Sequence, residues 1–197
     1  MDSNCYIIGC EETKEGIVVD PGAEGQRILK KVEELGLKVN KIILTHGHVD
    51  HIGALAEVQE ATGAKVLIHA DDAAQLTDAS KNLSAFVGQK MSVKAADQLL
   101  ADNDKIECGK LTLEVIHTPG HTRGGISLRC EPDILITGDT LFAGSVGRSD
   151  FPGGSHSQLI SSIKNRLLIF PPETKVFPGH GPSSTIDEEK RENPFLR

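Results

Sequence analysis

Four side chains of the types that bind metal ions occur in the six-residue segment 46–51. The segment directly follows a short apolar run that is typical of a buried strand. An extended backbone points residues i and i+2 to the same side, so His46 and His48 can place two imidazoles on one metal ion. Asp50 and His51 follow where the chain turns toward the next helix, and they can face a second point. The segment therefore predicts half of a two-metal site.

Three further candidate ligands follow predicted strands later in the chain, and each has glycine nearby: His121, Asp139 and His180. Glycine lets the backbone approach a bound ion closely and adopt turn geometry. If these strands share one edge of a sheet, five imidazoles and two carboxylates converge there. Nitrogen and oxygen donors without thiolate suit zinc, iron or manganese, and the donor set alone does not choose among them.

Other polar residues near strand ends have simpler interpretations. A single histidine at a strand end is more often a surface or core residue than a ligand, which is our interpretation of His69, His117 and His156. His69 is the least settled, because it also ends a predicted strand. Asp20 precedes Pro21 at the end of an apolar run. It either orients a ligating imidazole through a hydrogen bond or accepts turn hydrogen bonds.

Strands and helices surround these candidate ligands. The chain opens with a predicted β-hairpin, followed by a helix that ends near Gly36. Further strands are predicted at 41–45, 65–69, 106–108, 111–117, 126–130, 134–137 and 175–177. Helices are predicted around 55–60, from 71, around 159–168 and in a short polar tail, whereas residues 77–98 show weak periodicity. The order predicts one domain, residues 1–197, of α+β class with helices packed outside the strands.

Composition and charge argue against several classes of protein. The chain of 197 residues is long enough to bury a core, and its hydrophobic content of 38% is typical of a globular protein. A net charge of -7 without a basic block argues against nucleic acid as a partner. The N-terminus lacks a basic segment before an apolar core, and no apolar run approaches the length of a membrane span. We therefore expect a cytoplasmic location and no membrane partner, and the oligomeric state stays open.

The four cysteines, Cys5, Cys10, Cys108 and Cys130, form no CxxC pair. They indicate neither a disulfide framework nor a thiolate metal site. We interpret them as reduced, small apolar residues rather than reactive thiols.

With these motifs the sequence resembles the metallo-β-lactamase fold superfamily, whose HxHxDH signature matches residues 46–51. The three later ligand candidates match further motifs of the superfamily in the same order, and the resemblance runs through essentially the whole chain. It implies a four-layer αβ/βα sandwich with the metal site at one edge of the two sheets. It also implies that one metal is held by His46, His48 and His121 and the other by Asp50, His51 and His180, with Asp139 bridging both.

Within the superfamily the sequence is most similar to glyoxalase II-like hydrolases (hydroxyacylglutathione hydrolases), particularly the short bacterial type. The similarity is carried by residues 138–142, 147–151, 177–182 and 193–196. Arg148 matches a basic residue that the family uses near the substrate, and Asp150 stands where the family usually has a tyrosine. Full-length glyoxalase II has an additional C-terminal helical region that contacts glutathione, whereas this sequence ends at Arg197. An aspartate at position 139 argues against true β-lactamases, which often place cysteine at that motif.

These residues predict metal-assisted hydrolysis of a small thioester such as S-lactoylglutathione. Two divalent ions, with zinc favoured and iron or manganese as alternatives, would activate a shared water and polarise the carbonyl. Asp50 is the catalytic candidate, because it can orient the attacking hydroxide or accept its proton. A thiol with a pKa of about 8.5 leaves as a thiolate without a strong acid, which mildly favours thioesters over amides. Arg148 is the candidate to hold a substrate carboxylate, and the alternative is a structural ion pair with Asp150.

Three alternatives stay open. Residues 147–151 also resemble persulfide dioxygenases, which hold one iron through residues matching His46, His121 and Asp139. A metal-dependent nuclease would show a basic track, which this sequence lacks. A protein whose metals only stabilise the fold would more often have closed, single sites, whereas this set resembles an open two-metal site.

Overall fold

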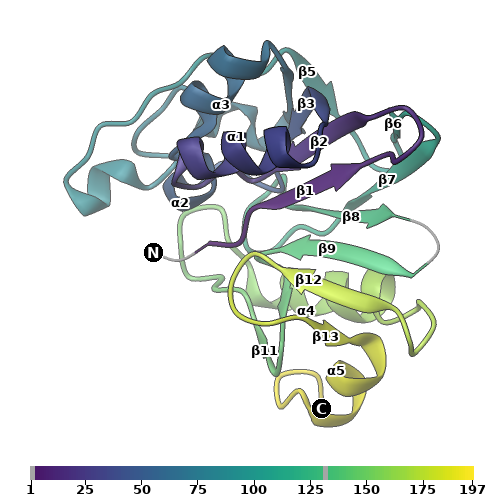
Figure 1. Ribbon diagram of the computed structural model, residues 1–197. Coiled ribbons are helices and arrows are strands. Elements are labelled where there is room, and N and C mark those ends of the chain that lie inside the picture. The colour runs from purple at the N-terminus through teal and green to yellow at the C-terminus, as the bar shows by residue number, and fades with distance from the viewer. Residues whose placement is uncertain (1–2, 131–132) are drawn as a thin grey trace. The chain divides into compact units, whose positions relative to one another are not determined.

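The computed structural model describes residues 3–130 and 133–197 (Figure 1). The chain divides into two compact units. The first consists of Met1–Leu100 and Glu107–Thr112, and the second of Ala101–Ile106 and Leu113–Arg197. Each unit carries helices packed against strands, and we describe the two separately.

The first unit is built on a five-stranded sheet of order β1-β2-β3-β4-β5. Its strands are β1 (Tyr6–Gly9), β2 (Glu15–Val19), β3 (Lys38–Ile43), β4 (Lys65–His69) and β5 (Gln98–Leu100). β1 and β2 form the predicted antiparallel hairpin, whereas β2, β3, β4 and β5 pair in parallel. The parallel pairs require crossover connections, and these carry the helices.

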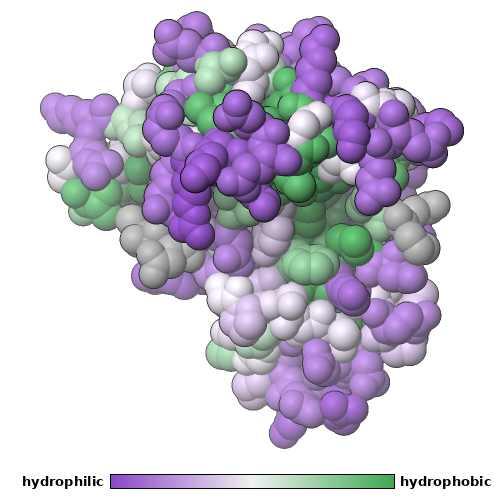
Figure 2. All heavy atoms as spheres, viewed as in Figure 1, coloured by the Kyte–Doolittle hydropathy of each residue, from purple (hydrophilic) through white to green (hydrophobic). Residues whose placement is uncertain are grey.

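The crossovers of the first unit contain α1 (Gly25–Glu34), α2 (Val49–Ile52), α3 (Leu55–Thr62) and the short 3₁₀ helices η1 (Ala70–Gln75) and η2 (Ser84–Val87). Ile28 and Val32 of α1 and Val58 of α3 are buried in one apolar cluster with strand residues such as Ile42 and Val66. The opposite face of α1 is polar, and Figure 2 shows hydrophilic side chains over it. The helix stops as predicted, because Gly36 adopts a left-handed φ of 64° just beyond it.

A six-stranded sheet of order β13-β12-β9-β8-β7-β6 lies largely in the second unit. Its strands are β6 (Lys105–Cys108), β7 (Leu111–His117), β8 (Ile126–Cys130), β9 (Ile134–Gly138), β12 (Lys175–Pro178) and β13 (Ser184–Thr185). A separate small hairpin consists of β10 (Leu141–Phe142) and β11 (Ser145–Val146). β9 and β12 pair in parallel, and both lead into candidate ligands.

The helices of the second unit are α4 (His156–Ser162), its π-helical continuation η3 (Ile163–Leu167) and α5 (Ile186–Glu192). Leu159, Ile163 and Leu167 recur at i+4 spacing and are fully buried in a cluster with Leu135 and Val176 of the sheet. α5 begins at a capping box formed by Thr185 and Glu188.

Most predicted elements are confirmed, and the differences have local causes. The helix predicted from residue 71 is the 3₁₀ helix η1, in which His69 accepts a hydrogen bond from the Asp71 amide at 3.3 Å. β10, β11 and β13 have two residues each, and β5 has three, so they are too short to show a sequence period. The single domain stays a prediction. No helix within the described residues is both long and apolar enough to cross a membrane.

All four cysteines are free, and their thiols differ in acidity. Hydrogen bonds from the Lys110 amide, at 3.4 Å, and from Thr13 lower the pKa of Cys10 to about 7. Burial, aided by the charge of Asp20, raises the pKa of Cys5 to about 12. The interpretation of all four as unreactive thiols stays a prediction, and the lowered pKa of Cys10 could not be foreseen because the sequence does not show that the Lys110 amide reaches its sulfur.

Cys10 is only 4% exposed, so we expect a small alkylating reagent to modify it slowly, but with a pH midpoint near 7, because the thiolate is the reactive form. Cys5 should react far more slowly at pH 8, since its thiol stays protonated there. Peptide mass mapping of timed samples measures both rates, with Cys10→Ser as the control. A Cys10 midpoint at or above the ordinary thiol value of about 8.5 would contradict the prediction.

Candidate metal centre

The first unit brings its four candidate ligands together. β3 ends at Ile43, and the chain then passes through a bend at Thr45 to His48, the extended N-cap of α2. The ligand atoms of His46 and His48 lie within 4.8 Å of one another, as do those of His46 and His51. The ligand atoms of Asp50 and His51 also lie within 4.8 Å of one another. The prediction that residues 46–51 can bind metal through converging side chains therefore agrees with the local geometry.

The three imidazoles of this segment are buried and oriented differently. The rings of His46 and His48 are nearly perpendicular at 88°, with centroids 4.6 Å apart. His46 and His51 lie at 4.2 Å and are tilted by 53°. Rings inclined in this way can point one nitrogen each toward a common position, whereas the nitrogens of stacked, parallel rings do not point toward one position.

Asp20 directly follows β2, contacts this segment and is only 1% exposed. Its Oδ2 lies 3.0 Å from Nδ1 of His51, and its Oδ1 accepts a hydrogen bond of 2.8 Å from the Thr45 amide. The Thr45 hydroxyl donates to Oδ2 at 2.6 Å. Asp20 thus contacts a candidate ligand and also accepts loop hydrogen bonds, and its role in orienting a ligand stays a prediction. Thr45 was not singled out by the sequence, although it directly precedes His46.

The second unit holds the other three candidate ligands, with two histidines close to Asp139. Oδ2 of Asp139 lies 3.6 Å from Nε2 of His121 and 3.5 Å from Nε2 of His180. Two ligand atoms that share one ion at about 2.1 Å lie roughly 3.0–3.6 Å apart, depending on the coordination angle. The observed separations suit two atoms on a common ion better than a direct hydrogen bond.

Residues in the loops of the second unit contact these ligands. Nδ1 of His121 donates to the Arg148 carbonyl oxygen at 2.6 Å, so the opposite nitrogen, Nε2, is the one near Asp139. His180 follows β12, and its ring meets Phe142 edge-on with centroids 6.0 Å apart. Gly147 lies so close to Asp139 that a Cβ there would be 1.8 Å from the Asp139 carbonyl oxygen.

The donor atoms of both units fit divalent metal ions. Each cluster offers imidazole nitrogens and carboxylate oxygens, and the hydrogen bonds to His51 and His121 use Nδ1 while leaving Nε2 for coordination. The described residues contribute no sulfur to these clusters. Nitrogen and oxygen donors suit zinc, iron and manganese alike.

Arg148 makes the ion pair that formed the alternative interpretation. Its Nε and Nη2 donate to the two carboxylate oxygens of Asp150 at 3.0 and 2.7 Å. The guanidinium also lies 4.2 Å from the ring centre of Phe151. The pair raises the pKa of Arg148 and lowers that of Asp150, and both side chains are exposed to solvent. The backbone of Arg148, rather than its side chain, contacts His121.

The histidines interpreted as non-ligands make structural contacts. His69 accepts the Asp71 amide hydrogen bond described above, and Nε2 of His117 lies 2.9 Å from the Arg123 carbonyl oxygen. His156 is the first residue of α4, with Nδ1 3.5 Å from the Ser149 hydroxyl.

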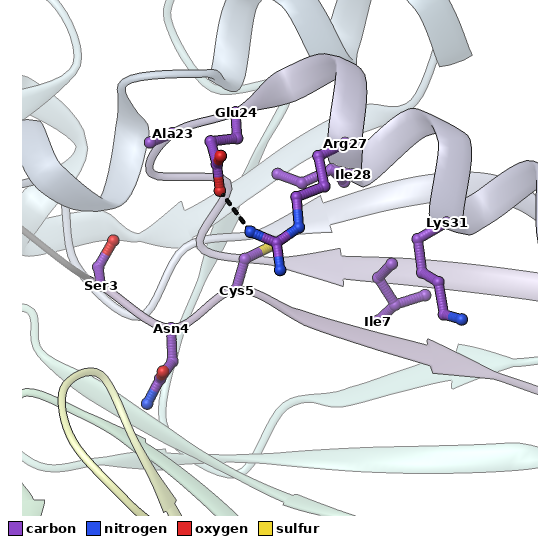
Figure 3. Close-up of a pocket in the computed structure, with 9 residues that line it drawn as sticks. All are labelled: Ser3, Asn4, Cys5, Ile7, Ala23, Glu24, Arg27, Ile28 and Lys31. Carbon is purple, nitrogen blue, oxygen red and sulfur yellow. Dashed lines mark hydrogen bonds and ion pairs between the residues drawn. The ribbon is translucent and has the colours of Figure 1, made fainter.

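Two hollows in the first unit differ in their relation to these ligands. A cavity of about 540 Å³ lies beside α1 and β1 (Figure 3) and contains no candidate ligand. Arg27 and Glu24 form an ion pair of 2.8 Å at its wall. A smaller cavity of about 380 Å³ is lined by Asp50 together with Val87 and Met91. The weakly periodic segment 77–98 therefore does more than connect elements, because it forms part of the wall beside Asp50.

The metallo-β-lactamase superfamily profile matches residues 1–180, and the chain belongs to this superfamily. The sequence is 36% identical over 203 residues to the hydroxyacylglutathione hydrolase GloC of Haemophilus influenzae, covering 100% of this chain and 93% of that protein. It is 38% identical over 198 residues to the probable metallo-hydrolase YqgX of Bacillus subtilis, with coverage of 100% and 93%. The predicted superfamily and the predicted likeness to glyoxalase II-like hydrolases are thereby confirmed.

Solved structures agree with this family. BLEG-1, described as a B3 metallo-β-lactamase, superposes with a TM-score of 0.93 at 36% identity, covering 98% of this chain and 94% of that one. TTHA1623 in a di-iron-bound form gives 0.87 at 36%, with 98% and 95% covered. ETHE1 from Myxococcus xanthus gives 0.81 at 34%, with 96% and 77% covered. The metallo-β-lactamase fold, with mixed α and β content and sheets flanked by helices, is therefore confirmed.

Proposed function

We propose that this chain is a metal-dependent hydrolase that cleaves a small thioester, such as S-lactoylglutathione, into a hydroxy acid and a thiol. The observation that carries the proposal is the spacing of Asp139 Oδ2 to two imidazole nitrogens, 3.6 Å to His121 and 3.5 Å to His180, which suits coordination. The likeness to a hydroxyacylglutathione hydrolase over the full chain supports the thioester as substrate. A small-molecule substrate, rather than nucleic acid, is also consistent with the net charge of -7.

We further propose that the two ligand clusters serve one binuclear centre. In this arrangement one ion would be held by His46, His48 and His121, the other by Asp50, His51 and His180, and both by Asp139. The superfamily motif supports the pairing, and the local geometry of each cluster is compatible with it. Zinc is our first choice, and the di-iron form of TTHA1623 supports iron as the alternative.

The chemistry follows from the ligands and from the leaving group. Two divalent ions held by these ligands would lower the pKa of a bound water and polarise the thioester carbonyl. Asp50 lies in the first turn of α2, and its carboxylate lies within 4.8 Å of a ring nitrogen of His51, where it could orient the attacking hydroxide and accept its proton. The thiol leaves as a thiolate, so this chain needs no dedicated acid for it.

The proposal is tested with metal-free protein reloaded separately with zinc, iron and manganese. Each form is assayed with S-lactoylglutathione, with acyl thioesters of other thiols and with a β-lactam, since BLEG-1 is a β-lactamase. We expect thioester turnover in at least one loaded form and none in the metal-free protein. Absence of thioester turnover in every form would contradict the proposal, and turnover of the β-lactam alone would replace it.

A persulfide dioxygenase is the second candidate, and the likeness to ETHE1 from Myxococcus xanthus at 34% identity favours it. Such an enzyme would hold a single iron through His46, His121 and Asp139 and would consume oxygen. Oxygen uptake by the iron-loaded protein with glutathione persulfide, in the absence of thioester turnover, would support it over the hydrolase.

The Arg148→Ala variant tests the proposed contact of this guanidinium with a substrate carboxylate. We expect the KM for anionic thioesters to rise about tenfold, as after loss of one charge-assisted hydrogen bond, with kcat and the KM for neutral thioesters unchanged. Arg191→Ala is the matched control, because Arg191 is also exposed and paired with acidic residues. An unchanged KM for every anionic thioester would show that Arg148 serves only its ion pair with Asp150.

A further inference from the structure

One buried carboxylate contacts two of the candidate ligands by different routes. Asp20 Oδ2 reaches Nδ1 of His51 directly at 3.0 Å. It is linked to His46 through Thr45, whose hydroxyl oxygen lies 2.6 Å from Oδ2 and 3.2 Å from Nδ1 of His46. Asp20 and Thr45 are each 1% exposed, so bulk water is kept from these hydrogen bonds.

The direction of each hydrogen bond follows from the number of hydrogens available. A carboxylate only accepts, so the single hydroxyl hydrogen of Thr45 is given to Asp20. The Thr45 oxygen then accepts from His46, which places the hydrogen of that ring on Nδ1. The ring of His51 likewise carries its hydrogen on Nδ1, facing Asp20. Both imidazoles therefore present Nε2 as the atom for coordination.

We propose that Thr45 is a positioning residue that relays the charge of Asp20 to His46, so that one carboxylate presets both His46 and His51 for metal binding. The proposal rests on the proposed binuclear centre, in which His46 and His51 serve different ions. Loss of the Thr45 hydroxyl then affects mainly the ion held by His46. Loss of the Asp20 charge affects both ions.

Threonine suits this task better than valine of the same shape. Its amide donates to Asp20 Oδ1 at 2.8 Å, so the backbone already holds the side chain against the carboxylate. A valine there would keep the shape and the amide contact, but it would leave a buried ring nitrogen and part of a carboxylate without the hydroxyl partner. Such losses at buried sites are costly because water does not replace the missing partner.

Metal titration of the Thr45→Val and Thr45→Ser variants tests the relay. Metal-free proteins are titrated with zinc against a chromogenic chelator, which yields an affinity for each ion without any assay of turnover. We expect Thr45→Val to weaken the ion held by His46 about 10–100-fold, the range found when a partner of a ligand is lost, and to change the other ion little. Thr45→Ser keeps the hydroxyl and should bind both ions as the parent does.

The Asp20→Asn variant extends the test to both ions. Its amide would donate to His51 and to the Thr45 hydroxyl, which places a hydrogen on Nε2 of both rings and opposes coordination. We therefore expect both affinities to fall. Thr174→Val is the control for removing a hydroxyl from a buried threonine, since Thr174 is 2% exposed.

Reference variants separate failure of the relay from failure of the proposed centre. His46→Ala and His51→Ala assign each measured affinity to its ion, and unchanged metal binding in both would refute the centre itself. If these two histidine variants behave as expected, the Thr45→Val result tests the relay by itself. The relay is refuted if Thr45→Val leaves both metal affinities unchanged, or if it lowers both equally.

Discussion

Replacement of Asp139 by alanine is expected to remove bound metal and thioester turnover together. Its carboxylate lies close to both His121 and His180 in the second unit, at 3.6 and 3.5 Å. In the proposed centre it is also the one protein side chain that both ions would share. Metal chemistry supplies several kcal/mol of transition-state stabilisation, so kcat/KM should fall by about 10³-fold or more.

The measurement is metal content per chain and turnover on the same sample of Asp139→Ala. Asp187→Ala is the control, since Asp187 is an exposed aspartate paired with Arg191. A variant at position 139 that keeps full metal content and turnover would refute its bridging role. Circular dichroism of both variants checks that the fold is intact.

The substitution Gly147→Ala is expected to damage the metal centre through the backbone alone. The added Cβ would lie 1.8 Å from the carbonyl oxygen of Asp139 and 2.9 Å from its carbonyl carbon. Neither atom belongs to a flexible side chain, so the loop carrying Asp139 must shift. Overpacking of this kind typically costs about 1–3 kcal/mol, and we expect the upper end of that range together with weakened metal binding.

Gly144→Ala is the matched control in the same hairpin region. A Cβ at Gly144 meets no atom within 4 Å, and the cost there comes only from its φ of 66°. That cost is about 1 kcal/mol. Urea unfolding of the metal-free proteins measures both free energies of unfolding. Equal losses in the two variants would show that the contact with Asp139 does not matter.

The elements that sequence predicts well are those whose periodicity spans several residues. The first hairpin, α1 with its stop at Gly36, and β7 through β9 all follow from apolar spacing and glycine positions. α2 was missed as a separate element, because its four residues coincide with the ligand motif and carry no helical period of their own. The same limitation applies to β10 and β11, which have two residues each.

The candidate ligands could be predicted because metal binding demands particular residue types at particular spacings. Residues that support the ligands are harder to predict, since any nearby hydroxyl or carboxylate can hydrogen-bond to a ligand. From the sequence, Asp20 has two alternative interpretations, and nothing marks Thr45 as a supporting residue. Both nevertheless contact the candidate ligands in residues 46–51. Arg148 shows the opposite case, because its likeness to a family residue did not reveal that its guanidinium is paired with Asp150.

The most direct test of the proposed hydrolase is the metal content of the purified protein, measured per chain and by element, with S-lactoylglutathione hydrolysis followed on the same sample. The proposal predicts close to two divalent ions per chain, mainly zinc, and thioester turnover that disappears on chelation and returns with metal. One iron per chain without thioester turnover would contradict it.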